Sequence, residues 1–396
     1  MLRVGFVGLG AISQEHVLGY LDNPDAEVIA VCCPDELAVQ LWLQKWKLPR
    51  ATHYTSLEAM LASEHLDLVE ILTPTYLHAE HAMACARAKV KGISLQKPMG
   101  LTLRECDEII ETCQRNGTTL KVFENYLFYP VYLKAKELID QGAIGEVLSL
   151  RLRTLGGLRE GAAWPWCWEP QSWRLDRKTA SVGPLTGDDG YHKFSLARWF
   201  MGREFEKVNA WIEPSNILDA PAFIRAKFKN VPGDAPKYAQ IDVSFSMHLA
   251  IPWDFWLDDF VEIVGSKAIM WINQCQGGGD RELFKGNAMS KSPAFPPIAL
   301  FVNGRVETYP MPDEDRSWAI SFVNSTKHFI QAMKTGEPPI CSGEQAKETL
   351  RCILASLVSA QEGRDVFLDD ITTETEALKK FEIKTIFCNP TTTVFA

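Results

Sequence analysis

The 396-residue chain contains no apolar run close to the ~18 residues of a membrane span, and with a net charge of −9 it has no basic stripe. Its ten cysteines include no Cys-x-x-Cys pair, and the adjacent Cys32 and Cys33 suit neither a disulfide nor a zinc site. We found no internal repeat and no low-complexity tract. These absences argue against a membrane partner, a nucleic-acid partner and a metal site. A strand expected from residue 2 leaves no place for a signal peptide, so we expect reduced thiols and a cytoplasmic protein.

What the chain does have is an ordinary globular composition, 46% hydrophobic and 23% charged, with a length that favours two domains. The first part alternates short apolar runs with helical patterns. The runs lie at 2–7, 27–32, 68–72, 92–95 and 119–123, and the helical patterns near 11–22, 35–46, 56–63, 76–88 and 102–115. This alternation predicts an α/β fold with a doubly wound parallel sheet over residues 1–124.

From about residue 145 the pattern changes to longer alternating segments, which predict an open, mostly antiparallel sheet. The segments are 146–154, 205–213, 222–229, 239–248, 256–264 and 268–273. The stretches 162–176 and 276–298 are typical of long loops, and two helices are expected at 316–334 and 344–361. We therefore predict a second α/β domain over 125–386 and a polar tail at 387–396. Which domain the helix 316–334 packs on stays open.

The most informative stretch is the glycine turn that directly follows the first strand. Gly8 permits a tight turn, and Gly10 lets backbone N–H groups approach a pyrophosphate at the start of a helix. Ser13, at the third small position, still allows close packing of helix and strand. The alternative is a turn in some other βαβ unit, but the strand–turn–helix context favours a dinucleotide site, with Ala11 and Ile12 beside the phosphates.

The end of the second strand is where such a site needs a carboxylate for the adenosine ribose. Cys33 occupies this position, and Asp35 follows two residues later. No lysine or arginine stands nearby to bind a 2′-phosphate. We therefore expect NAD, with NADP as the alternative. Asp35 has an equally simple second interpretation as the N-cap of the next helix.

Three further side chains have the chemistry needed to oxidise an alcohol. Lys97 ends a buried strand on the ligand side of the sheet, where its ammonium can stabilise a developing oxygen charge. Asp188 and His192 are spaced i,i+4 at the head of a predicted helix, and a histidine beside a carboxylate suits a general base. The alternatives are a solvated lysine, a helix cap and a packed core histidine. An upstream nicotinamide site favours the catalytic interpretation.

Taken together, these motifs resemble the glucose–fructose oxidoreductase / inositol dehydrogenase / rhizopine-catabolism (Gfo/Idh/MocA) family. The resemblance extends over about residues 2–370 and rests on motifs that occur in the family's order. They are Gly8-Leu9-Gly10 with His16, Thr73–His78, Gln96-Lys97-Pro98, Glu124-Asn125-Tyr126, Ile139–Val147, Trp173-Arg174, Asp188-x-Gly190-x-His192 and Gly343–Ala346.

The resemblance implies an N-terminal Rossmann domain, a C-terminal α/β domain whose open sheet mediates homodimers or homotetramers, and NAD(P)-dependent oxidation of a sugar or cyclitol. It assigns catalysis to Lys97, Asp188 and His192 and implies a cis peptide before Pro98. The predicted cofactor-binding residues are Gly8, Gly10, Ala11, Ile12, Cys33, Asp35, Thr73, Pro74, His78, Gln96, Lys97 and Asn125. The predicted substrate-binding residues are Tyr126, Trp164, Trp173, Arg174, Asp188 and His192.

Several positions depart from the family pattern. Gln96 replaces the usual glutamate, which removes a charge near the cofactor ribose, and Cys33 replaces the usual aspartate. Ser195 stands where an aspartate often follows the histidine. Lys193, next to the histidine, would either lower the imidazole pKa or face solvent.

The substrate signal is a group of tryptophans before the catalytic helix: Trp164, Trp166, Trp168 and Trp173. Aromatic faces pack against the C–H faces of sugar rings, while Arg159, Glu169 and Arg174 add polar contacts. A hydrophobic plug or a subunit contact is the alternative. Two other functions use the same cofactor: a redox-neutral enzyme that cleaves glycosides with recycled NAD, and a non-catalytic dinucleotide sensor. An intact set of catalytic side chains argues against the sensor.

Overall fold

The computed structural model describes residues 1–157, 173–174, 177–180, 182–212, 219–246, 257–273, 296–312, 314–373 and 375. The chain forms two compact units. Unit 1 comprises Met1–Asn125, Lys178–Ser181 and Phe322–Leu350, and unit 2 comprises Tyr126–Arg177, Val182–Ser321 and Arg351–Ala396. Helices α9 (Trp318–Thr335) and α10 (Gly343–Glu362) have residues in both. The helix whose place the sequence left open therefore belongs mostly to unit 1.

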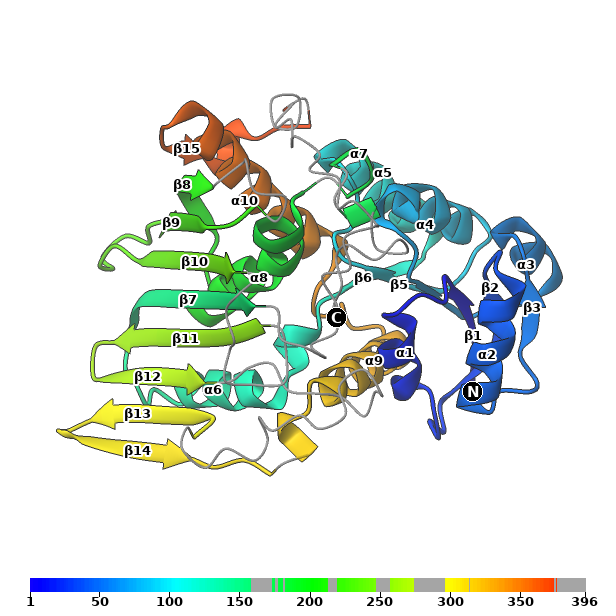
Figure 1. Cartoon of the computed structure of the whole chain (residues 1–396), viewed down its shortest axis with the longest axis horizontal. Helices are drawn as coiled ribbons and strands as arrows, with labels where there is room; N and C mark the ends of the chain where they lie inside the picture. The colour runs from blue at the N-terminus through cyan, green and yellow to red at the C-terminus, as the bar shows by residue number, and fades with distance from the viewer. Residues whose placement is uncertain are drawn as a thin grey trace. The chain divides into compact units, whose positions relative to one another are not determined.

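Unit 1 is built on a six-stranded parallel sheet in the order β3-β2-β1-β4-β5-β6 (Figure 1). Its strands are β1 (Leu2–Val7), β2 (Ala26–Cys32), β3 (Thr52–Tyr54), β4 (Leu68–Ile71), β5 (Gly92–Gln96) and β6 (Thr119–Phe123). This is the strand order of a dinucleotide-binding Rossmann domain, with its switch point between β1 and β4. The five predicted apolar runs match five of these strands; the short edge strand β3 has no apolar run and was not predicted.

Helices cover both faces of this sheet because its strands alternate buried side chains between them. Val4 and Phe6, both fully buried, pack with Trp42 and Phe329 on one face. The elements on that face are α1 (Ser13–His16), its 3₁₀ continuation η1 (Val17–Gly19), α2 (Glu36–Trp46) and α9. Gly5 faces the other way, since a Cβ there would lie 3.3 Å from Met60 on α3. That face is covered by α3 (Leu57–Ser63), α4 (His78–Arg87) and α5 (Leu103–Asn116).

Unit 2 contains a nine-stranded sheet in the order β14-β13-β12-β11-β7-β10-β9-β8-β15, which Figure 1 shows from bottom to top. Its strands are β7 (Val147–Gly157), β8 (Phe205–Ile212), β9 (Ala222–Phe228), β10 (Tyr238–Ser246), β11 (Leu257–Gly265), β12 (Ala268–Asn273), β13 (Ile298–Val302), β14 (Arg305–Tyr309) and β15 (Val366–Phe367). Only the pairing of β7 with β10 is parallel. The prediction of an open, mostly antiparallel sheet is therefore confirmed.

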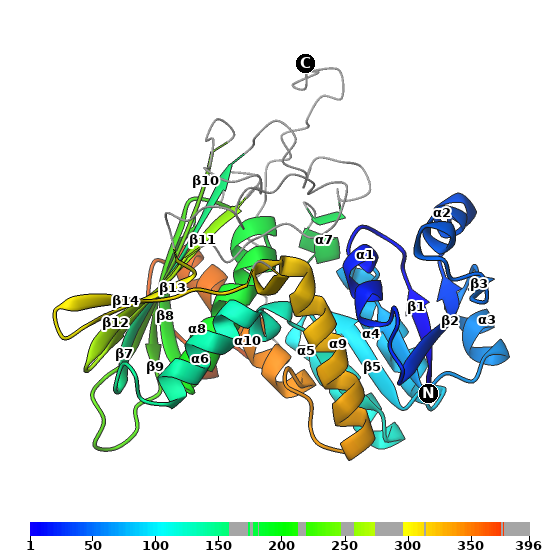
Figure 2. The ribbon, with the colours of Figure 1, turned by 90° about the horizontal axis from the view of Figure 1, so that it is seen from below.

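The two faces of this sheet differ. Figure 2 shows it nearly edge-on, with α6 (Pro130–Asp140), α8 (Gly190–Met201) and α10 on one side and no helix of the described chain on the other. Strand β9 follows the same division: Ala222 and Ile224 are fully buried, whereas Phe223 and Arg225 between and after them are exposed. This period of two is the pattern of a sheet packed on one face only.

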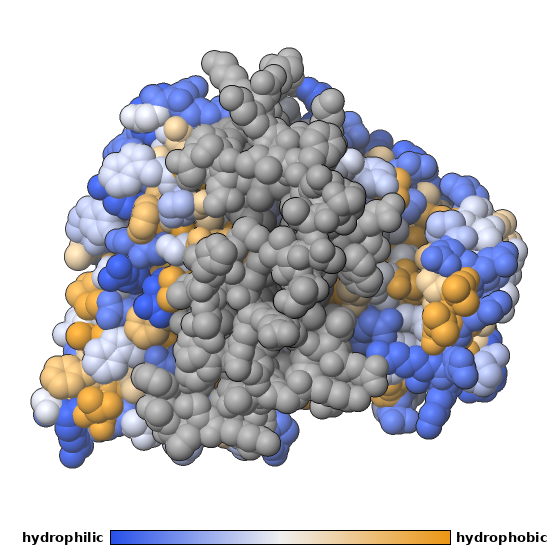
Figure 3. Space-filling model, viewed as in Figure 1, coloured by the Kyte–Doolittle hydropathy of each residue, from blue (hydrophilic) through white to orange (hydrophobic). Residues whose placement is uncertain are grey.

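On unit 1, helix α2 carries exposed apolar side chains. Leu37 and Leu41 of α2 are exposed, and Figure 3 shows hydrophobic residues among hydrophilic ones at this end of the chain. Within the described ranges, no helix has both the length and the apolar character to cross a membrane.

Candidate functional site

The glycine turn after β1 is built as the sequence predicts, but the helix that follows is short. Gly8 has φ +90°, and a Cβ at this position would lie 3.0 Å from the backbone of Leu72 and Thr73. The Ser13 hydroxyl donates to the Gly10 carbonyl at 2.6 Å and accepts from Trp42 Nε1 at 3.0 Å. Helical structure spans Ser13–Gly19 rather than the predicted 11–22. The turn is therefore fixed by its backbone geometry and by the buried Ser13, and the short helix that follows contributes less.

The turn leaves open space at Gly10. A Cβ placed on the exposed Gly10 would meet no atom within 4 Å, and Ala11 and Ile12 beside it are half-buried. Gly8 is thus needed by the fold, while Gly10 leaves open space that the fold does not need. Such an opening at the carboxyl end of β1 is where the phosphates of a bound dinucleotide lie in this strand order.

Two alanine substitutions separate the requirement of the fold from that of the cofactor. Gly8→Ala forces a side chain into a left-handed conformation, so we expect the free energy of unfolding to fall by about 1–3 kcal/mol. Gly10→Ala should leave that free energy unchanged, yet weaken NAD binding by about tenfold or more, because the methyl group enters the phosphate space. Thermal unfolding and fluorescence titration with NAD measure the two effects. Undiminished NAD affinity in Gly10→Ala would place the phosphates elsewhere.

At the end of β2, Asp35 plays the capping role that the sequence offered as its second interpretation. Its Oδ1 accepts the backbone N–H of Ala38 at 2.9 Å and begins α2. The half-buried Cys33 is held by its backbone, since its N–H donates to Tyr54 O at 3.0 Å. Asp35 is exposed, and its role toward the ribose stays a prediction.

The loop after β4 is tied to the loop after β5 by His78. This ring is buried, with Nε2 lying 2.8 Å from Thr73 O and Nδ1 lying 2.8 Å from Pro98 O. Both neighbours are carbonyl acceptors, so the ring donates to whichever carbonyl faces its protonated nitrogen. The histidine that the sequence placed along the cofactor therefore holds Thr73, Pro74 and the Lys97-Pro98 turn in place.

Gln96, the departure from the family glutamate, takes part in a buried network. Its Oε1 accepts the Lys97 N–H at 2.7 Å, which turns its amide nitrogen toward His16 Nε2 at 3.1 Å. The amide donates, so His16 Nε2 must accept, and the Nδ1 proton goes to Glu70 Oε2 at 3.0 Å. Tyr20 donates to the other Glu70 oxygen at 2.5 Å. These hydrogen bonds, which run from Glu70 through His16 to Gln96, fix the backbone of Lys97.

Lys97 and Asn125 complete the predicted set in unit 1. Lys97 is half-buried where β5 ends, and the Lys97–Pro98 peptide is cis, as the resemblance implied. Asn125 is buried directly after β6 and opens the 3₁₀ turn η3 (Asn125–Phe128). Because neighbouring parallel strands end at one edge of the sheet, Gly8, Cys33, Thr73 and Asn125 follow strands at that edge and Gln96 ends one.

In unit 2, Asp188 lies in a π-helical turn, η5 (Pro184–Asp189), and not in the α-helix that the spacing predicts; α8 begins at Gly190. The buried carboxylate of Asp219 accepts the N–H groups of Leu185 at 2.9 Å and Thr186 at 3.1 Å. The carboxylate thereby provides the acceptor for two backbone N–H groups at the start of the π-helical turn. The π-helical turn that Asp219 caps, and not a regular α-helix, therefore sets where Asp188 lies along the chain before His192.

Asp188 is engaged by an arginine. Arg174 Nη1 lies 2.5 Å from Asp188 Oδ2, and the guanidinium lies 4.5 Å from the ring centroid of Trp173. The structure therefore brings together Trp173, Arg174 and Asp188, three residues that the sequence assigned to substrate binding. Trp164, assigned to the same role, lies outside the described residues, as do Trp166, Trp168, Arg159 and Glu169.

His192, on α8, stacks face to face on Tyr126. The ring centroids are 4.0 Å apart and the planes differ by 12°. The neighbouring Lys193 does not face solvent: only 2% of it is exposed, and its Nζ lies 2.9 Å from Asp189 and 3.0 Å from Asp259. Burial lowers the pKa of Lys193, but the two carboxylates raise it by more, so the pKa lies above its ordinary value.

Sequence reasoning missed Glu70, Asp219 and Asp259, the buried carboxylates behind the predicted site. Two of them had a usable signal, a charge inside a predicted buried strand that needs a partner: Glu70 lies within the run 68–72, and Asp259 shares the inward register of Val261 and Ile263 on β11. The partner of Asp219 is more than thirty residues away in sequence, so no local pattern could reveal it. Among the described residues, no cluster of histidine, cysteine, aspartate and glutamate side chains is arranged to hold a metal ion.

Comparison with known proteins identifies the family of this chain. The model for the N-terminal domain of the Gfo/Idh/MocA oxidoreductases, an NAD-binding Rossmann fold, matches residues 2–124, and that of their C-terminal α/β domain matches residues 136–368. The chain is 26% identical to myo-inositol 2-dehydrogenase of Thermotoga maritima, covering 93% of this chain and 99% of that one. It is 24% identical to D-apiose dehydrogenase of Paraburkholderia graminis, covering 94% and 91%.

A solved structure shares the fold over nearly the whole length. An oxidoreductase from Agrobacterium radiobacter, in complex with NAD⁺, L-tartaric acid and magnesium, aligns with a TM-score of 0.75 at 18% identity, covering 94% of this chain and 99% of that one. The open glycine turn and the strand order agree with the match to the NAD-binding domain. The protein belongs to the Gfo/Idh/MocA oxidoreductase family, with an NAD-binding Rossmann domain followed by the α/β domain of that family.

Proposed function

We propose that this enzyme transfers a hydride between a secondary alcohol of a sugar or cyclitol and the nicotinamide of NAD, with His192 as the general base. The observation that carries the proposal is the combination of an open glycine turn with Lys97 in unit 1 and Arg174, Asp188 and His192 in unit 2, in a chain of an oxidoreductase family. Relatives named as dehydrogenases of myo-inositol and D-apiose support a polyhydroxylated substrate.

The proposed roles follow from the chemistry of alcohol oxidation. The carbon–hydrogen bond breaks with its electron pair, the hydroxyl loses its proton, and a carbonyl forms. NAD, when bound, accepts the hydride. The imidazole of His192 takes the hydroxyl proton, while the Lys97 ammonium stabilises the negative charge that develops on oxygen. Asp188, which is held by its ion pair with Arg174, positions the substrate for this transfer.

NAD is the proposed cofactor because the end of β2 is negative. Cys33 is followed by Asp35 and Glu36, which would repel a 2′-phosphate, and no cationic side chain occurs before Lys45 near the end of α2. A carboxylate at this place binds the ribose hydroxyls of NAD.

The test is to incubate the purified protein with NAD or NADP and a panel of inositols, pentoses, hexoses and glycosides, and to follow NADH absorbance. We expect one polyol to reduce NAD, with kcat/KM for NADP lower by about tenfold or more. A glycoside cleaved without net NADH, by protein that retains NAD through gel filtration, would favour the redox-neutral alternative. Bound NAD with no turnover of any kind would favour the sensor.

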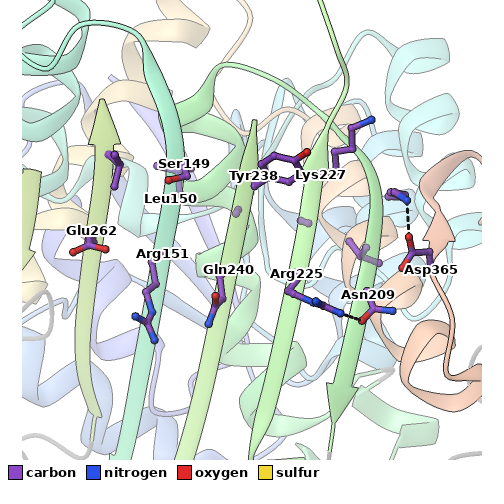
Figure 4. A pocket seen from close by; sticks show the side chains of 15 residues that line it. Ser149, Leu150, Arg151, Asn209, Arg225, Lys227, Tyr238, Gln240, Glu262 and Asp365 are labelled. Carbon is purple, nitrogen blue, oxygen red and sulfur yellow. Dashed lines mark hydrogen bonds and ion pairs between the residues drawn. The ribbon is translucent and has the colours of Figure 1, made fainter. Parts of the chain in front are cut away.

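We further propose that a second copy of the chain covers the open face of the unit 2 sheet, giving a homodimer or homotetramer. Trp211, Phe223 and Tyr238 are exposed there, 63%, 43% and 51% respectively. Figure 4 shows Arg151, Tyr238 and other side chains of this face around a shallow hollow of about 760 Å³. Charged side chains of this face bind partners within it: Arg225 donates to Asn209 (Figure 4), and Lys207 pairs with Asp365. Sedimentation velocity would measure the oligomeric state.

The cysteines support the reducing compartment that we expect. Those in the described part of the chain are free thiols, and burial raises the pKa of Cys32 to about 11 and of Cys113 to about 12. Such thiols are inert as nucleophiles at neutral pH. We propose that they are packing residues of a cytoplasmic protein.

A further inference from the structure

We propose that Tyr126, Lys193, Asp189 and Asp259 form a platform that sets the orientation of the His192 imidazole, and that none of the four contacts the substrate. We call these residues the imidazole platform. The inference rests on the proposed role of His192 as general base and adds the residues that make it effective. All four belong to unit 2, as does His192.

The first observation is the stack itself. The Tyr126 and His192 centroids are 4.0 Å apart with nearly parallel planes, so the tyrosine ring covers one face of the imidazole. Rotation of a histidine ring about χ2 is otherwise broad. A flat partner in contact restricts this rotation and fixes the plane of the imidazole ring. The sequence assigned Tyr126 to the substrate, but only 2% of it is exposed, which suits a positioning residue better.

The second observation is that the tyrosine is itself anchored. Its hydroxyl donates to Asp259 Oδ2 at 3.1 Å, and Thr154 donates to Asp259 Oδ1 at 2.7 Å. Asp259 is 1% exposed, so its charge must be balanced within the protein. A carboxylate that accepts from two elements, η3 and β7, leaves the Tyr126 ring little freedom to slide.

The third observation is the cation that balances this carboxylate. Lys193 lies between Asp189 and Asp259, and its Nζ is 4.9 Å from the centroid of the Tyr126 ring. His192 and Lys193 are consecutive on α8, so the backbone that carries the imidazole also carries the ammonium that binds its partner ring. An ammonium within about 6 Å of a tyrosine centroid is attracted to that ring. Helix α8, the stack of Tyr126 on His192 and the ion pairs of Lys193 therefore each restrict the movement of the other two.

The platform is tested by separating its effect on His192 from its effect on folding. Tyr126→Leu removes the stack, and we expect kcat to fall by about 10²-fold with KM little changed, since a small misplacement of a reacting group has that effect. Tyr126→Phe keeps the ring and loses only its anchor, so a smaller loss of kcat is expected. Tyr129→Leu is the matched control: Tyr129 is equally buried, and its hydroxyl donates to Arg316 O at 2.8 Å. It should lower the melting temperature and leave kcat unchanged.

The decisive measurement is a double-mutant cycle with His192→Ala. If the platform acts through the imidazole, Tyr126→Leu will not slow the residual reaction of His192→Ala any further. An equal loss in both backgrounds would show a purely structural role and overturn the inference. Near-normal turnover by His192→Ala would instead refute the proposed function. Should Tyr126→Leu fail to fold, Asp259→Asn combined with His192→Ala makes the same test, with the same outcomes.

Discussion

Replacing His192 with alanine is expected to lower kcat by about 10²–10⁴-fold, the usual contribution of a positioned general base. Without the imidazole, the hydroxyl proton must pass to water while the hydride leaves carbon. NAD affinity should be unaffected, because the open glycine turn is formed by unit 1. Stopped-flow measurement of NADH formation, together with fluorescence titration of NAD, separates the two quantities. Lys97→Met should lower kcat in the same direction, because it removes the cation that stabilises the developing oxygen charge.

The control for this prediction is another histidine. His65 is exposed on the loop before β4, and His65→Ala should leave kcat unchanged. Added imidazole should restore part of the activity of His192→Ala but none of that of Lys97→Met. Turnover within a few-fold of normal in both His192→Ala and Lys97→Met would require another base and would contradict the assignment.

Substituting Lys193 with methionine should have the largest effect on stability, lowering the free energy of unfolding by about 3–5 kcal/mol. The methionine fills the space of the lysine stem but leaves the carboxylates of Asp189 and Asp259 buried without their cation. Because the pKa of Lys193 is raised in the folded protein, its stabilising effect is fully present below the unfolded pKa and is lost only as pH rises through the folded pKa. The loss in Lys193→Met should therefore be constant from neutral to mildly alkaline pH.

The same chemical change at the surface is the control. Lys229 and Asp369 form an ion pair at 3.4 Å with both side chains more than half exposed, and Lys229→Met should change the free energy of unfolding by less than about 1 kcal/mol. Chemical denaturation measures both variants. Combining Lys193→Met with Asp259→Asn should recover part of the loss, since it removes one uncompensated charge. Equal effects of Lys193→Met and Lys229→Met would show that Lys193 is not the cation that balances the buried pair.

The parallel sheet of unit 1 could be predicted because its strands are buried on both faces and are therefore continuous apolar runs. The glycine turn could be predicted for a related reason: Gly8 has a φ that other residues rarely adopt, so the residue type reveals the backbone. The hairpin of β13 and β14 was missed although it had a signal. Asn303 and Gly304 both have positive φ, the dipeptide and geometry of a tight hairpin turn.

The parts of the site that escaped prediction depend on distant partners. The sequence offered Lys193 only two roles, lowering the imidazole pKa or facing solvent, because Asp259 lies 66 residues further along the chain. The spacing of Asp188 and His192 predicted a regular helix, and the π-helical turn capped by Asp219 altered it. The loss of charge at Gln96 was foreseen, but its consequence was not: a neutral amide there makes His16 an acceptor at Nε2.

Unit 1 is assembled from both ends of the chain, and this affects how the protein is made. Phe329 and Ile330 of α9 belong to the same hydrophobic core as Val4 and Phe6, and the Val122 N–H donates to Cys341 O at 2.8 Å. During synthesis the six strands of this sheet leave the ribosome long before the segment that covers them. The nascent Rossmann domain must therefore wait, with part of its apolar face uncovered, until unit 2 has nearly been translated. Because of this order, we expect chaperones that bind exposed hydrophobic surface to bind the first domain during synthesis.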